Sequence, residues 1–69
     1  MRVIVAYDIS DDACRDAVAR RLLTWGVRLQ ESVFECVIGD DLLESTCAQL
    51  TSMIDPARDH LQVIPLCDD

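Results

Sequence analysis

The 69-residue, 7.7 kDa chain has room for one small domain. Its apolar content of 51% excludes a disordered chain, and a domain of this size buries only about 60% of its unfolded surface, so a partner surface would stabilise it. Thirteen acidic residues against six basic ones give a net charge of −7, which excludes a uniformly basic nucleic-acid clamp.

The charge is distributed unevenly along the chain. Residues 1–34 carry five arginines and five acidic residues, whereas residues 35–69 carry Arg58 and eight acidic residues. The negative excess therefore belongs to the second half. Every basic residue is arginine, whose planar guanidinium suits bidentate phosphate contacts. We expect contacts with phosphate groups in the first half, and we expect the acidic second half to turn away or to face a basic protein partner.

The sequence shows neither a targeting segment nor a membrane span. The first apolar run, Val3–Tyr7, is too short for the core of a signal peptide and is followed by acidic residues. The longest apolar runs fall far below the length that crosses a bilayer. We therefore expect a cytoplasmic protein with no membrane partner.

The four cysteines lack the Cys-x-x-Cys pairs that zinc sites normally use. The favoured interpretation is that they are small buried hydrophobic side chains, and the alternative is a disulfide pair. They stand at positions 14, 36, 47 and 67.

The first predicted element is a strand over residues 2–8. This β-branched run carries apolar side chains at both odd and even positions, with Val3 and Val5 on one face of the strand and Ile4 and Ala6 on the other. Both faces of the strand should therefore be covered, which places it centrally in a sheet.

A helix is predicted next, with Ser10 as its N-cap and Asp11 and Asp12 in its first turn, where the helix dipole favours negative charge. Gly26 is the predicted C-terminal stop. The apolar stripe at helical spacing consists of Cys14, Ala17, Val18, Leu22 and Trp25.

Residues 27–38 indicate two short strands with a break near Glu31 and Ser32, where the alternation is lost. A second helix is predicted to open at residues 39–41, with Asp40 as its cap, and to end at Asp55-Pro56. Its predicted buried stripe consists of Leu43, Cys47, Leu50 and Ile54.

The last predicted strand spans residues 61–66, and Pro65 indicates an edge position or a strand end. The resulting order, β-α-β-β-α-β, is typical of a ferredoxin-like α+β fold. We expect residues 1–69 to form a single domain, with a four-stranded antiparallel sheet and two helices on one face. The other face then needs a cover, and a homodimer through that face is the simplest solution.

Asp8 is the position where chemistry is most expected, because it lies at the carboxyl end of a central strand and just before a helix. The alternative is a capping or solvated turn residue. Magnesium binds through one or two carboxylates, several waters and substrate phosphates. A two-fold axis near Asp8 would supply a second Asp8. The pair could then hold Mg²⁺ or another divalent cation, which would polarise a phosphodiester and activate water. Asp8 is therefore the catalytic and metal-binding candidate.

Arg15 and Arg28 are candidates for binding nucleic-acid phosphates, and the alternative is that they are exposed salt-bridge partners of nearby acids. Tyr7 and Phe34 are interpreted as core or interface aromatics that support the site. The sole histidine, His60, falls in a polar loop with no partner nearby in sequence, which argues against a histidine-based nucleophile.

Three blocks of sequence stand in order along nearly the whole chain: Val3–Asp12, Trp25–Cys36, and a tail made of residues 54–56 and 59–67. Together they resemble the CRISPR-associated protein two family, the small ferredoxin-like nuclease and adaptor of spacer acquisition. The resemblance implies a homodimer in which two copies of Asp8 face each other. It also implies magnesium-dependent endonuclease activity on single-stranded RNA or double-stranded DNA, and a bridge between two dimers of the integrase subunit.

The resemblance also bears on other positions. Tyr7, Arg15, Arg28 and Phe34 match family positions that are linked to activity. Ala17 stands where many members carry a second arginine. Members commonly continue beyond the point at which this sequence stops, with a further strand that pairs across the dimer.

Three functions are compatible with these observations. The first is a metal-dependent phosphodiesterase that uses paired Asp8. The second is a non-catalytic adaptor that positions the integrase and spacer DNA. The third is a small regulatory ligand-binding module of the same fold, which leaves the three sequence blocks unexplained.

Overall fold

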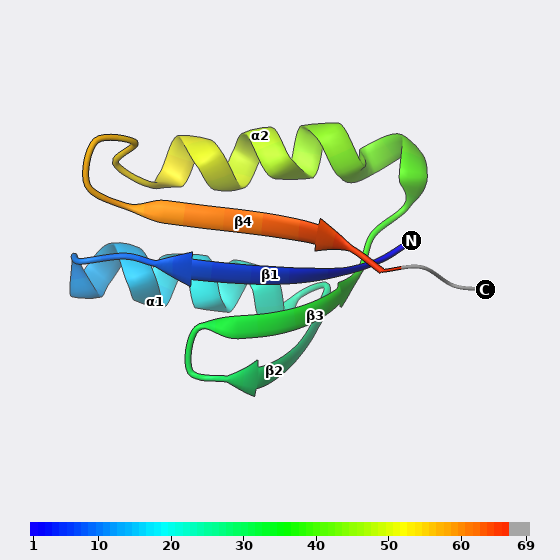
Figure 1. The fold of residues 1–69 in the computed structure, drawn as a ribbon, viewed down its shortest axis with the longest axis horizontal. Helices are drawn as coiled ribbons and strands as arrows, with labels where there is room; N and C mark the ends of the chain where they lie inside the picture. Colours follow the sequence, from blue (N-terminus) through cyan, green and yellow to red (C-terminus); the bar gives the residue numbers. More distant parts are fainter. Residues whose placement is uncertain (67–69) are drawn as a thin grey trace.

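The computed structural model describes residues 1–66, so predictions that involve Cys67 or the end of the domain at residue 69 lie outside the described part. The elements follow the predicted order β-α-β-β-α-β (Figure 1). They are β1 (Arg2–Asp8), α1 (Asp12–Leu23), β2 (Gly26–Gln30), β3 (Val33–Val37), the 3-10 turn η1 (Asp40–Leu42), α2 (Leu43–Met53) and β4 (His60–Pro65). Within residues 1–66, no helix has the length and apolar character that a membrane span requires.

The four strands form one antiparallel sheet in the order β2-β3-β1-β4. β1 lies between β3 and β4, which confirms the central position predicted from its apolar side chains on both parities. β4 is an edge strand, and an edge suits Pro65 because proline cannot donate a ladder hydrogen bond. The turn at Glu31 and Ser32 joins β2 to β3, at the predicted break.

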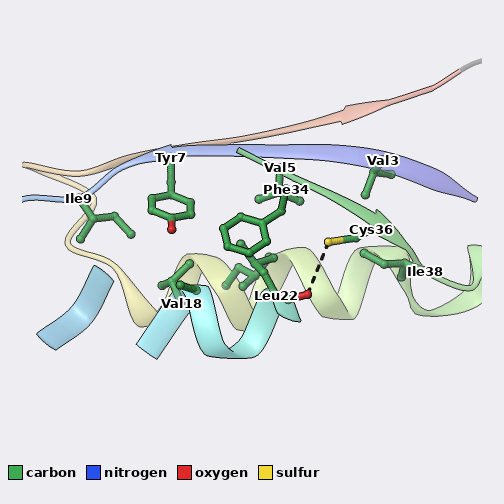
Figure 2. Close-up of a cluster of buried hydrophobic side chains, with 11 residues drawn as sticks. Val3, Val5, Tyr7, Ile9, Val18, Leu22, Phe34, Cys36 and Ile38 are labelled. Atoms are coloured by element: carbon green, nitrogen blue, oxygen red, sulfur yellow. Dashed lines mark hydrogen bonds between the residues drawn. The ribbon is translucent and has the colours of Figure 1, made fainter. Parts of the chain in front are cut away.

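Both helices lie on the same face of the sheet, and the hydrophobic core fills the space between the two layers (Figures 1 and 2). Phe34 of β3 is fully buried in this core. Burial of a side chain of this size contributes about 1.5–3 kcal/mol. The core residues are Val3, Val5, Tyr7, Ile9, Val18, Ala19, Leu22, Phe34, Cys36, Ile38 and Leu50.

The opposite face of the sheet, which we call the open face, is covered by no element among residues 1–66. Ile4 and Ala6 of β1 lie on it and are half-buried. The register adds Val27, Val37 and Ile64, which are 58%, 65% and 47% exposed. Exposed apolar side chains on a sheet face, here beside the Arg2–Glu35 ion pair, are typical of an interaction surface. That a second copy of the chain covers it stays a prediction.

The N-cap of α1 differs from the prediction. Asp11, predicted to lie in the first turn, is the N-cap, and its carboxylate accepts the backbone N–H of Cys14 at 2.8 Å. Ser10, the predicted cap, donates its own backbone N–H to Asp59 at 3.2 Å. The cap shifts by one residue because Asp11, with extended dihedral angles, is the residue from which the chain enters the helix.

Gly26 opens β2 and does not terminate the helix, which corrects a second prediction. α1 already ends at Leu23, with Thr24 as its C-cap. A Cβ atom at Gly26 would lie 1.9 Å from the carbonyl oxygen of Glu35, so glycine is needed here for close approach of two backbones.

The start of the second helix also differs from the prediction. The 3-10 turn η1 precedes α2, and the N-cap of α2 is Leu42, without a side-chain cap hydrogen bond. Asp40, the predicted cap, instead lies 3.4 Å from the N-terminal ammonium of Met1, which competes for its carboxylate. The predicted end is confirmed, since α2 ends at Met53, just before Asp55.

The described cysteines are free thiols. Cys36 is buried, whereas Cys14 and Cys47 are half-buried. The Cys14 thiol donates to the Met53 carbonyl at 2.9 Å, and burial raises the pKa of both Cys14 and Cys36. The prediction of buried hydrophobic cysteines is therefore confirmed for Cys36, whereas Cys14 and Cys47 are only partly buried.

Candidate functional site at the end of β1

Asp8, the exposed last residue of β1, lies directly opposite His60, the first residue of β4. Because side chains alternate along a strand, the register places both on the open face, with Ala6 and away from Tyr7. Cβ atoms of directly opposite residues lie about 4.5–5.5 Å apart in antiparallel pairs. The carboxylate and the imidazole are therefore neighbours. A shallow hollow at this place is lined by Ala6, Tyr7, Asp8, His60, Leu61 and Gln62.

The buried carboxylate of Asp59 ties together the loops beside this pair. One oxygen accepts the backbone N–H of Ser10 at 3.2 Å, and the other accepts the backbone N–H of Asp55 at 3.0 Å. The hydrogen bonds from Asp55 and Ser10 hold the pKa of Asp59 below its ordinary value. Ser10 follows Asp8 by two residues, and Asp59 directly precedes His60. This Asp59 clamp therefore closes the β1–β4 ladder just beyond the Asp8–His60 pair.

Arg15 lies in α1 and reaches back to the loop that follows β1. One guanidinium nitrogen donates to the Ile9 carbonyl at 3.1 Å, and the other pairs with Asp12. The hydrogen bond and the charge of Asp12 raise the pKa of Arg15. The predicted salt bridge is thus present. Because the side chain is still 37% exposed near the Asp8 end of the sheet, a phosphate could share or replace Asp12.

Three of the predicted residues form a stack on the core side of the sheet. The rings of Tyr7 and Phe34 lie 6.1 Å apart between centroids with 23° between their planes, and both are buried in the core (Figure 2). The Arg28 guanidinium carbon lies 5.0 Å from the Phe34 centroid. The Tyr7 hydroxyl donates to the Glu31 carbonyl at 3.3 Å. The structure thus confirms Tyr7 and Phe34 as core aromatics.

Asp8 and Arg28 lie on opposite faces of the sheet. Arg28 is opposite Phe34 in the β2–β3 ladder and therefore lies on the core side of the sheet, whereas Asp8 lies on the open face. Arg28 shares a shallow hollow with Asp16 and Arg20 of α1. One chain therefore brings Arg15, but not Arg28, to the end of β1. A nucleic acid that contacts both Asp8 and Arg28 has to pass around the sheet or reach a second chain.

The residues of one chain fit a sparse cation site. Residues 1–66 contain no group of three or more His, Cys, Asp or Glu side chains that could hold a metal ion. The exposed Asp8 carboxylate nevertheless suits magnesium, which takes one or two carboxylates and fills its remaining positions with water and phosphate oxygens. A second carboxylate would have to come from another copy of the chain.

Sequence reasoning missed Asp59 and the surroundings of His60. The sequence places His60 in a loop without a partner, but β4 begins one residue earlier than predicted and its register sets His60 opposite Asp8. Register between distant segments is not encoded in local periodicity. The predicted antiparallel sheet could have shown that His60 lies near Asp8, because the end of one strand lies beside the start of its antiparallel neighbour.

Fold and site together define the class of protein. A four-stranded antiparallel sheet, two helices on one face and an exposed acid at the end of the central first strand describe a small ferredoxin-like α+β protein. Residues 1–69 match the family model described as CRISPR associated protein Cas2. The chain belongs to this Cas2 family.

Individual relatives agree with this assignment. A CRISPR-associated endonuclease Cas2 2 of Thermus thermophilus is 40% identical over 62 residues, which cover 90% of this chain and 69% of that protein. A CRISPR-associated endoribonuclease Cas2 4 of Rhodospirillum rubrum is 35% identical over 66 residues; the match covers 96% of this chain but only 53% of that protein. The crystal structure of Streptococcus pyogenes Cas2 at pH 6.5 matches with a TM-score of 0.90 at 28% identity, covering 100% of this chain and 89% of that one. The ferredoxin-like fold is thereby confirmed.

Proposed function

We propose that this protein is a cytoplasmic, metal-dependent endonuclease of CRISPR adaptation that hydrolyses phosphodiester bonds of RNA or DNA. The observation that carries the proposal is the exposed Asp8 carboxylate at the end of the central strand, on the open face. The relatives' names, endonuclease in one case and endoribonuclease in another, support phosphodiester hydrolysis. In this role the protein serves antiviral defence together with the CRISPR integrase subunit.

The active unit in this proposal is a homodimer through the open face. Ile4, Val37 and Ile64 give that face an apolar surface, which a second copy would bury. A two-fold axis near the end of β1 would bring two Asp8 carboxylates together. It would thereby complete the site that one chain leaves with a single carboxylate.

The chain's own residues divide the work at this site. Asp8 would hold the cation, for which Mg²⁺ is the expected species. When bound, a divalent cation polarises the phosphodiester and lowers the pKa of a bound water. Arg15 binds a neighbouring phosphate of the same strand, since its guanidinium lies beside the loop that follows Asp8. Tyr7 and Phe34 support β1 and β3 from the core side.

The charge distribution along the chain supports a nucleic-acid substrate for the first half. Five of the six arginines belong to residues 1–34, and the acidic excess belongs to residues 35–69. Arg28 extends the basic surface along β2 and α1, where it binds phosphates beyond the cleavage point. A basic protein partner, such as an integrase surface, suits the acidic half.

The test is the variant Asp8→Asn, which keeps the shape of the side chain and removes its charge. We expect cleavage of single-stranded RNA and of double-stranded DNA to fall to background, while size-exclusion chromatography shows an unchanged dimer. The control Glu44→Gln removes one exposed acid from α2, far from β1 in sequence, and keeps full activity. Cleavage that persists in Asp8→Asn and is unaffected by a chelator contradicts the nuclease proposal.

A second function, a non-catalytic adaptor that bridges integrase dimers and spacer DNA, is favoured by the division of charge along the chain. The arginines of residues 1–34 and the acidic excess of residues 35–69 could contact DNA and a basic protein partner without any cleavage chemistry. If the adaptor role is sufficient, Asp8→Asn supports spacer integration in cells as well as the wild type does, and a variant that breaks the dimer does not. An Asp8→Asn dimer that fails to support integration argues against the adaptor function alone.

A further inference from the structure

We propose that His60 is a second metal-ligating residue of the Asp8 site, so that each chain supplies one carboxylate and one imidazole. The inference rests on the proposed function, because it requires Asp8 to bind a divalent cation. Its starting point is the β1–β4 ladder, in which Asp8 and His60 are directly opposite each other.

The geometry allows both side chains to reach one ion. They project from adjacent strands to the same face, and both line the hollow at this end of the sheet. No hydrogen bond or salt bridge within residues 1–66 engages either side chain. Both are exposed, so an ion with its waters and a substrate phosphate has access.

The two strand ends that carry the pair are held in place. The end of β1 and the start of β4 lie at the same end of the molecule (Figure 1). The Asp59 carboxylate joins the loop after Asp8 to the loop before His60 by accepting the backbone N–H of Ser10 at 3.2 Å, and it braces the second loop internally by accepting the backbone N–H of Asp55 at 3.0 Å. The Asp59 carboxylate holds these two strand ends in place. Ligands on fixed strand ends are better preorganised for an ion than ligands on free loops.

The ligand set points to a class of cation. Carboxylate and water oxygens alone suit magnesium, whereas an added imidazole favours first-row transition ions over magnesium, and Mn²⁺ is the one of these that also suits carboxylate and water oxygens. If two chains meet at a two-fold axis, the site holds up to two carboxylates and two imidazoles. We therefore expect a preference for Mn²⁺ over Mg²⁺ that depends on His60.

The experiment uses the full chain and Mn²⁺ alone as the probe, at slightly alkaline pH. Isothermal titration gives Kd for Mn²⁺ and for Mg²⁺ in the wild type, His60→Gln, Asp8→Asn and the control Arg58→Gln, and circular dichroism checks that each variant is folded. Arg58→Gln removes a nearby positive charge but no ligand. Pulsed electron paramagnetic resonance on the wild type detects whether nitrogen is bound to Mn²⁺, and that measurement needs no variant.

We expect His60→Gln to weaken Mn²⁺ binding by about tenfold or more, to change Mg²⁺ binding much less, and to abolish the nitrogen signal seen in the wild type. Arg58→Gln should not weaken binding. If Asp8→Asn abolishes Mn²⁺ binding but His60→Gln does not weaken it and the wild type gives no nitrogen signal, His60 is not a ligand, although the proposed function survives. If Asp8→Asn leaves Mn²⁺ and Mg²⁺ binding unchanged, both the inference and the proposed metal site fail.

Discussion

The carboxylate of Asp59 is the one charged side chain that is buried among residues 1–66. A buried carboxylate is tolerated when its oxygens are hydrogen-bonded, and here two backbone N–H groups satisfy them. The surroundings of this carboxylate have opposing effects on its pKa. Arg58 and His60 favour the charged form, whereas burial disfavours it. The backbone hydrogen bonds dominate this balance and hold the pKa of Asp59 below its ordinary value.

This pKa shift predicts how stability depends on pH. A carboxyl group whose pKa is lower in the folded state contributes stability above its unfolded pKa, and this contribution is lost as the pH falls through the folded value. We expect Asp59→Asn to lower the urea midpoint of unfolding at neutral pH. The difference from the wild type should begin to shrink below about pH 4, where the unfolded carboxyl of the wild type takes up its proton, and should disappear only below the lower pKa of the folded state.

Asp11→Asn is the matched control for this pH dependence, because asparagine is as good an N-cap as aspartate. Its midpoint should stay close to that of the wild type throughout the pH range. A constant difference between Asp59→Asn and the wild type down to strongly acidic pH would show that the charge of Asp59 contributes nothing.

The contact between Arg28 and Phe34 gives a second prediction for single residues. Arg28→Met keeps the packing of the stem and removes the charge above the ring. We expect a loss of about 0.5–1 kcal/mol in the free energy of unfolding. The loss should disappear in a Phe34→Leu background, which a double-mutant cycle by urea unfolding measures. Arg20→Met, from the same hollow, is the control and should change stability less. Equal losses in both backgrounds would mean that the ring does not bind the charge.

Single residues of the site were predictable to different degrees. Asp8 could be found because it is the acid at the carboxyl end of a predicted central strand, just before a helix, and Arg15 because helical spacing places it near that junction. The roles of His60 and Asp59 depend on which residue of β4 faces which residue of β1, and that register is fixed by packing across the sheet. The placement of Asp8 and Arg28 on opposite faces of the sheet also depends on strand register.

At the scale of elements, β1 was predictable from its continuous β-branched run and α1 from its apolar stripe at helical spacing, and polar residues follow each of them. The start of α2 was not predictable from local sequence, because Asp40 binds the ammonium group of Met1, which is far from it along the chain. Gly26 was assigned the wrong role for a similar reason. Its constraint comes from Glu35 across the β2–β3 ladder, and local sequence cannot show it.

The two glycines provide a direct comparison at this scale. In Gly26→Ala the new Cβ meets the backbone of Glu35 at 1.9 Å, so β2 and β3 must separate. In Gly39→Ala the nearest atom is a carboxylate oxygen of Asp41, 2.9 Å away, on a side chain that can rotate. We expect Gly26→Ala to lower the free energy of unfolding by about 2 kcal/mol or more, and Gly39→Ala to change it by less than about 0.5 kcal/mol. Similar unfolding midpoints for the two variants in urea would contradict this account.

At the scale of the whole molecule, the open face decides whether the chain works alone. Its exposed apolar residues favour a partner surface, and that a second copy of the chain supplies this surface stays a prediction. The sequence could predict the need for a cover, because two helices cover only one face of a four-stranded sheet. The sequence could not predict which residues of a partner surface contact which residues of the open face.

A charge on the open face tests the dimer. Ile4→Glu places a carboxylate in the middle of β1 on that face, and we expect it to weaken dimerisation by about 2 kcal/mol or more, roughly thirtyfold in Kd. Leu42→Glu adds the same charge to η1, at a side chain that is 56% exposed and lies outside the sheet. Sedimentation velocity should show monomers for Ile4→Glu and dimers for Leu42→Glu. Dimers of unchanged affinity in Ile4→Glu would place the interface elsewhere.

The most direct test of the central claim, that two copies of Asp8 form one catalytic site, is the cleavage rate of mixed dimers. Wild-type and Asp8→Asn chains are unfolded together, refolded at varying ratios and assayed at constant total protein. If each site needs both carboxylates, an equal mixture keeps about a quarter of the wild-type rate, because only that share of randomly paired dimers holds two copies of Asp8. A rate that falls in simple proportion to the fraction of wild-type chains, about half at equal mixing, would show that each Asp8 acts alone and would contradict the paired site.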